Sequence, residues 1–159
     1  MGEINWKDKC WVATLYMVRD DGKVLLSWNK QMQTWIPIGG HMEAGETPED
    51  AVKREVLEET GFDFEFLHKS KFENNSEVEI VKFERLQLEK VPHHNMHMNF
   101  VFFGKCTRYQ EKGETDEKEK LRWFSRDELI NEKNEILESV FEMSIKAIDE
   151  VAKSNTISS

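Results

Sequence analysis

Apolar residues in the first third of the chain gather in short runs rich in β-branched and aromatic side chains, which favour β-strands. The pattern predicts strands over 11–18 and 23–28, joined as a hairpin through a turn at 20–22. A short extended segment is expected at 34–38. Three more strands are expected further on, near 62–70, over 77–88 and over 97–107. The strands over 77–88 and 97–107 are expected to pair with each other.

Two helices are expected between and after these strands. Thr47 is a suitable N-cap, Pro48 suits the first helical position, and Gly61 tolerates the backbone of a helix C-terminus, so a helix is predicted over 47–60. A second helix over about 134–153 has apolar and small residues at helical spacing: Ile136, Val140, Ser144, Ala147, Ile148 and Val151. The stretch from Tyr109 to Lys120 has no apolar residue after the tyrosine and is expected to be a solvated loop. Mixed strands with helices imply a layered α/β fold.

The first helix has an unusual arrangement of carboxylates. Glu55, Glu58 and Glu59 stand at i, i+3 and i+4, so they project from one side of the helix, where like charges cost stability. A solvated acidic face is the alternative explanation for such a pattern. Gly39 and Gly40 precede the helix, where the backbone can approach a ligand closely, and Glu46 lies at its start. These residues indicate an oxygen-rich site for Mg²⁺ or Mn²⁺.

This segment resembles the signature box of the Nudix hydrolases, which cleave nucleoside diphosphates linked to another group. The family pattern is matched without departure at Gly40, Glu46, Arg54, Glu55, Val56, Glu58, Glu59, Gly61 and Phe62. The flanks are similar too, with 35–40 leading into the box and 121–129 resembling a late strand followed by a helix. The resemblance implies an α/β/α sandwich with a mixed sheet.

The resemblance also implies roles for the box residues. Glu58 and Glu59 are the expected metal ligands, Glu55 is a further ligand or the base that activates water, and the Gly39 carbonyl is another ligand. Arg54 is expected to orient a box carboxylate, the alternative being a simple surface ion pair. For Glu46, the expected role is to brace the loop or Arg54.

Outside the box, the candidates are weaker. Glu117, in the acidic loop before Trp123, is the candidate for a distant metal ligand, although such a run is usually only a solvated segment. His97 is a candidate for substrate contact together with Gly40, since the spacing of His93, His94 and His97 fits no zinc motif. Trp28 and Trp35 could stack on a nucleobase, whereas aromatic residues in such strands are more often core residues.

Length and composition fit a single domain, with 38% apolar residues to build its core. The resemblance implies that this is one Nudix domain over residues 1–159, with about 8–153 as its ordered core. The N-terminal sequence has no signal-peptide or bilayer-spanning pattern, so a cytoplasmic location without membrane contact is expected. Cys10 and Cys106 have no metal-type spacing and receive no function. A net charge of −9 argues against an extended nucleic-acid partner but not against a small phosphorylated substrate. Family members often form homodimers.

Three functions remain open from the sequence. The first is a metal-dependent pyrophosphohydrolase acting on nucleoside triphosphates, including oxidised ones, with ADP-ribose, nucleotide sugars and dinucleoside polyphosphates as alternatives. The second is a nucleotide-binding regulatory module that lacks turnover, although no box glutamate is replaced. The third is a pyrophosphohydrolase of RNA 5′ ends, which should need a basic groove.

Overall fold

The structure is a computed structural model, which describes residues 9–69, 81–91, 96–110 and 121–157. In chain order these residues form β1 (Cys10–Val18), β2 (Val24–Asn29), β3 (Thr34–Ile36), β4 (Ile38–His41), α1 (Pro48–Glu59), β5 (Asp63–Phe66), β6 (Arg85–Glu89), β7 (His97–Arg108), β8 (Leu121–Phe124), α2 (Arg126–Asn131), a 3₁₀ turn (Lys133–Glu135) and α3 (Glu138–Ile157). No helix in these ranges combines the length and the apolar character that a bilayer span requires.

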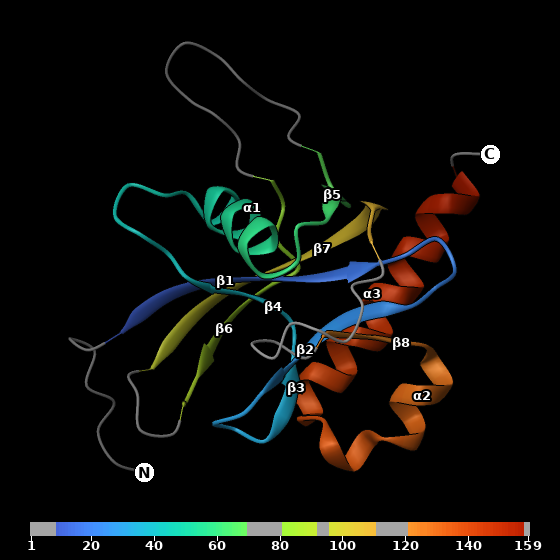
Figure 1. Ribbon diagram of the computed structural model, residues 1–159. Helices are drawn as coiled ribbons and strands as arrows, with labels where there is room; N and C mark the ends of the chain where they lie inside the picture. The colour runs from blue at the N-terminus through green and yellow to red at the C-terminus, as the bar shows by residue number, and fades with distance from the viewer. Residues whose placement is uncertain (1–8, 70–80, 92–95, 111–120, 158–159) are drawn as a thin grey trace.

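The centre of the sheet is the parallel pair of β1 and β7, in register from Cys10↔His97 to Val18↔Lys105. The path through the sheet is β3-β2-β1-β7-β5, with β4 also on β1, β6 on β7 and β8 on β2. Figure 1 shows α1 and α3 on opposite sides of these strands. The expected α/β/α sandwich with a mixed sheet is therefore confirmed.

Each face of the sheet has its own core because successive side chains of a strand point to opposite faces. On β1, Leu15 and Met17 pack toward α1 with Ala51, Val52 and Val56 of that helix. Tyr16 and Val18 face the other way and pack with the apolar side of α3, which contributes Val140, Met143, Ala147, Ile148 and Val151.

The helix α1 begins and ends at the residues that the sequence indicates. The Thr47 side chain accepts a hydrogen bond from the Asp50 amide and Asp50 returns one to the Thr47 amide, which together form a capping box. At the other end, the Gly61 amide donates to the carbonyl groups of Val56 and Leu57, and its φ of +67° is the left-handed value that glycine tolerates. The box helix is thus fixed at both ends by its own sequence.

Several expected boundaries shift. The strand expected near 62–70 ends at Phe66, and within 81–89 the strand begins only at Arg85, while 77–80 lie outside the described residues. The expected pairing of this strand with β7 is confirmed. The helix expected from 134 begins at Glu138, because Ile136 adopts an extended conformation and forms a β-bridge with Trp35.

The expected hairpin is present only at its closed end. β1 and β2 pair antiparallel at Val18↔Val24 and then separate, because β2 takes β3 and β8 as partners. β1 instead pairs with β4 over the two glycines that open the box, through Ala13↔Gly40 and Thr14↔Gly39. This separation brings the start of the box onto the central strand.

Candidate active site

The site is built at the corner where β4 leads into the loop before α1, and its first requirement is two glycines. Gly39 has a φ of +146°, and a Cβ there would lie 2.2 Å from the Ala13 carbonyl oxygen. A Cβ on Gly40 would lie 2.5 Å from Oε1 of Glu55. The glycines therefore let β1 and the helix carboxylate approach the same two residues of backbone.

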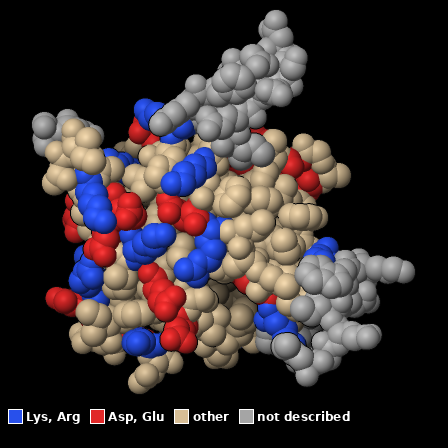
Figure 2. Space-filling view, turned by 180° about the vertical axis from the view of Figure 1, so that it is seen from behind, with Lys and Arg blue, Asp and Glu red and all other residues tan. Residues whose placement is uncertain are grey.

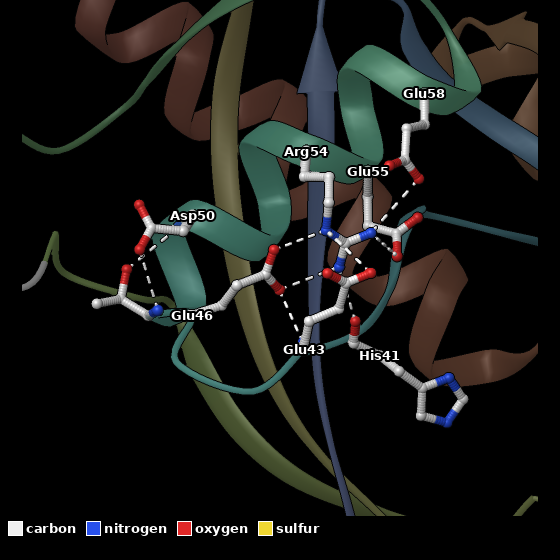
Figure 3. A network of polar contacts seen from close by, with 8 residues as sticks. His41, Glu43, Glu46, Asp50, Arg54, Glu55 and Glu58 are labelled. Atoms are coloured by element: carbon white, nitrogen blue, oxygen red, sulfur yellow. Dashed lines mark hydrogen bonds and ion pairs between the residues drawn. The ribbon is translucent and has the colours of Figure 1, made fainter.

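Arg54 lies at the centre of the polar contacts at this corner (Figure 3). Its guanidinium donates to both carboxylate oxygens of Glu46, at 2.6 and 3.0 Å. It also donates to Oε1 of Glu55 at 3.0 Å and, more weakly, to Glu58 at 3.4 Å. The same group reaches the His41 carbonyl oxygen at 2.9 Å, so it joins the helix to both ends of the preceding loop. We call these five residues the Arg54 network.

This network differs from a simple surface ion pair. The Arg54 side chain is only 22% exposed and has several charged partners at once, with Glu43 also within 3.9 Å. Glu46 in turn accepts a hydrogen bond from the Glu43 amide. The pKa of the Glu46 carboxyl is lowered, chiefly by the hydrogen bonds from Arg54, and the pKa of Arg54 is raised for the reciprocal reason. Both groups are therefore held in their charged forms.

The carboxylates of α1 offer the chemistry of a hard divalent cation. Glu55 and Glu59 are partly buried, and Glu58 is exposed, on one side of the helix. Within the described ranges, no three acidic, histidine or cysteine side chains are already gathered as a metal site. The Arg54 guanidinium instead neutralises part of the charge on Glu55 and Glu58. Carboxylate oxygens beside a glycine backbone fit Mg²⁺ or a similar ion, which prefers oxygen ligands.

A cavity of about 640 Å³ opens beside this corner, on the α3 side of the sheet. Gly39, Gly40 and His41 form one wall of it, and His97 of β7 lies on another. The rings of His41 and His97 meet edge to face, with centroids 5.0 Å apart. Among the expected substrate contacts, Gly40 and His97 thus line a cavity that is continuous with the box.

The two tryptophans lie elsewhere. Trp35 is 2% exposed and packs in the core against Trp28 and Phe124, and neither tryptophan belongs to the cavity wall. Trp35 corresponds to the core alternative, since a buried ring has no face to offer a base, whereas Trp28 is partly buried and packs against the same core. Glu117, His93 and His94 lie outside the described residues.

The cavity residues that were not identified from the sequence include Thr14, Gln87, Glu89 and Asn99. A signal was present, since polar residues alternate with apolar ones in Gln87-Leu88-Glu89 and in His97-Met98-Asn99. Such alternation marks the two faces of a strand. Only the pairing of β6 with β7 shows that these polar residues share one face.

The site thus combines an α/β/α sandwich, a glycine corner, an arginine-centred carboxylate network and an adjoining cavity. Comparison with known families gives the class of protein. The NUDIX domain model matches residues 9–142, and the chain therefore belongs to the Nudix hydrolase family.

Similar proteins include the oxidized purine nucleoside triphosphate hydrolase of Danio rerio, 40% identical over 76 residues, which are 44% of this chain and 49% of that protein. A putative 8-oxo-dGTP diphosphatase of Bacillus subtilis is 27% identical over 71% of this chain and 64% of its own length. The chain thus spans about half to two thirds of these relatives. A solved NUDIX-family hydrolase from Clostridium perfringens superposes with a TM-score of 0.73 at 26% identity, over 89% of this chain and 97% of that one.

Proposed function

We propose that this protein is a metal-dependent pyrophosphohydrolase that acts, as a single Nudix domain, on nucleoside triphosphates, including oxidised ones. The observation that carries the proposal is the Arg54 network, in which one guanidinium holds Glu46, Glu55 and Glu58 at the edge of a nucleotide-sized cavity. The names of the zebrafish and Bacillus relatives support this substrate class.

The proposed ion is Mg²⁺ or Mn²⁺, held by Glu55, Glu58 and Glu59 with the Gly39 carbonyl oxygen. When bound, such an ion neutralises phosphate oxygens and lowers the pKa of water. Arg54 would keep the carboxylates oriented before substrate arrives, and Glu46 would brace Arg54 and the loop through its two hydrogen bonds. Glu55 remains either a ligand or the base that takes a proton from water at a carboxylate oxygen.

An RNA 5′ end is the less favoured substrate. Figure 2 shows Lys and Arg side chains interspersed with Asp and Glu side chains, without a continuous basic band among the described residues of that face. The net charge of −9 points the same way, because long nucleic acids are bound by basic surfaces. ADP-ribose, nucleotide sugars and dinucleoside polyphosphates remain alternatives for the same site.

The test is release of phosphate and pyrophosphate from a panel of these substrates, with Mg²⁺ or Mn²⁺, by the wild type and Glu58→Gln. Loss of the charged ligand should lower turnover by roughly a hundredfold or more while the fold is kept. Glu142→Gln, on the exposed side of α3, is the matched control and should retain full activity. Unchanged turnover in Glu58→Gln would overturn the metal assignment. If the wild type hydrolysed no substrate of the panel, the proposed pyrophosphohydrolase activity would be overturned.

A further inference from the structure

The part of the cavity wall that β1, β6 and β7 form contains an ordered set of polar side chains, whose role rests on the proposed function. In the register of β6 and β7, Gln87 lies opposite Asn99 and Glu89 lies opposite His97. These residues stand at alternate positions of neighbouring strands, so all four share one face. Thr14 of β1 adds to the same face, and we call these five residues the polar wall.

Hydrogen bonds fix the orientation of the polar wall. The Thr14 hydroxyl donates to the Asn99 side-chain carbonyl at 3.1 Å, so the Asn99 amide nitrogen is left as a donor. This nitrogen donates to Oε1 of Glu89 at 2.7 Å, and the Gln87 amide donates to the same oxygen. Asn99 is 3% exposed, which means that its amide cannot turn without losing buried hydrogen bonds.

The second oxygen of Glu89 is differently placed. This oxygen, Oε2, lies 4.0 Å from Nδ1 of His97, which is beyond hydrogen-bond distance. The Glu89 side chain is 31% exposed and lines the cavity. This carboxylate therefore has one oxygen satisfied by the protein and one available to a ligand.

A buried tyrosine lies close to Glu89 in the cavity wall. Tyr16, on the same face of β1, is 2% exposed, and its pKa is raised chiefly by burial and secondly by the negative charge of Glu89. Hydrogen bonds to a charged group strengthen where water is excluded. A ligand group that donates to Glu89 would therefore contribute strongly to selectivity.

A carboxylate only accepts hydrogen bonds, so it selects a base edge that carries donors. Guanine presents two adjacent donors, N1–H and the 2-amino group, and its 8-oxo form keeps both. Adenine presents one amino group beside the lone pair of N1, which a carboxylate repels. We propose that Glu89 is the specificity-determining residue of this site and reads the N1–H and 2-amino edge of a guanine-type base. Both donors of that edge share the second carboxylate oxygen, and Asn99 positions the carboxylate through the first.

The proposal is tested by isothermal titration calorimetry of the full chain with GMP, IMP and AMP in the presence of Mg²⁺. The wild type should bind GMP at least about tenfold more tightly than AMP, with IMP between them because it lacks the 2-amino group. Glu89→Gln should weaken GMP binding by about 10- to 100-fold and should not weaken AMP binding, which tightens because the repulsion of adenine N1 is removed. Glu89→Asp keeps the charge and should retain part of the preference. Glu65→Gln, an exposed carboxylate on β5 outside the cavity wall, should change nothing.

Equal losses for GMP and AMP in Glu89→Gln, or no preference in the wild type, would overturn the proposal. Glu58→Gln separates this inference from the proposed hydrolysis, since it should lose turnover and keep the preference for GMP. A wild type that binds GMP preferentially but cleaves no nucleotide would contradict the proposed hydrolase activity and support the role of Glu89 in base recognition. A wild type that hydrolyses nucleotides but shows no Glu89-dependent preference for GMP would contradict the role of Glu89 and leave the hydrolase proposal standing.

Discussion

The Arg54 network and the polar wall meet at His41 and His97, yet they are assembled in opposite ways. In the network, every group comes from residues 41–58, which are the last residue of β4, a loop and one helix, continuous in sequence. In the polar wall, Thr14, Gln87 and Asn99 come from three strands that pair across the chain. The first region is therefore encoded locally, whereas the second exists only once the sheet has formed.

Gly39→Ala should have the largest effect, because it damages both regions. The added Cβ would meet backbone, 2.2 Å from the Ala13 oxygen and 2.7 Å from the Thr14 Cα, at a φ of +146°. Since backbone cannot yield cheaply, the free energy of unfolding should fall by about 3 kcal/mol or more in chemical denaturation. Gly22 also has a positive φ, +78°, but a Cβ there would meet open space. Gly22→Ala should therefore lower the free energy of unfolding by only about 1 kcal/mol. Equal losses in the two variants would contradict the backbone clash.

Gly40→Ala should damage the network alone. Its Cβ would meet the Glu55 carboxylate, the end of a flexible side chain that can move aside. Turnover should therefore fall by roughly a hundredfold, while the free energy of unfolding changes by less than about 1 kcal/mol. Kinetics and denaturation of the same sample check both statements. Full activity would show that the position of Glu55 against Gly40 does not matter for the chemistry.

Arg54→Lys should have a smaller effect on turnover. An ammonium cannot donate to both Glu46 oxygens and also to Glu55 and the His41 carbonyl, so kcat should fall by about tenfold. Arg108→Lys is the matched control, because among the described residues Arg108 forms an ion pair with Asp63 alone, and both side chains are more than half exposed. An equal loss of kcat in both variants would show that replacing any paired arginine by lysine lowers turnover, and that the hydrogen bonds of Arg54 have no special role.

The smallest expected effect is on stability at acid pH. Because the pKa of Glu46 is lowered from its usual 4.5 in the folded protein, its ion pair stabilises above pH 4.5 and is lost as pH falls through the lowered pKa. The difference in melting temperature between the wild type and Glu46→Gln should therefore shrink below pH 4.5. Thermal melts between about pH 7 and 3 measure this. A constant difference would exclude a contribution from the Glu46 charge.

The contrast between the regions explains what could be predicted from the sequence. The ends of α1 and the position of the box follow from caps and spacing within about twenty residues, and these predictions are confirmed. The role of each box residue stays a prediction. Arg54 was expected to meet a box carboxylate, but its bond to the His41 carbonyl depends on the fold of the loop between them.

Other features could not be predicted because distant packing decides them. Ile136 has helical spacing with the residues of α3, yet its bridge to Trp35 keeps it extended and delays the helix to Glu138. Asn99 and Glu89 are ordinary polar residues in sequence, and only strand register makes them neighbours. Caps and residue spacing therefore determine individual helices and strands, whereas the cavity forms only when strands distant in sequence pair with one another.

The parallel pairing of β1 and β7 affects the order in which the protein folds during its synthesis. Strands in parallel need a crossover, and here the crossover contains β2, the entire box and β6. Contacts of such long range close slowly, because the entropy of the loop must be overcome before the strands meet. During synthesis, the ribosome releases the whole box well before β7 emerges. The nascent chain therefore holds its most acidic helix without the central strand partner, and the cavity is completed only when the second half of the chain arrives.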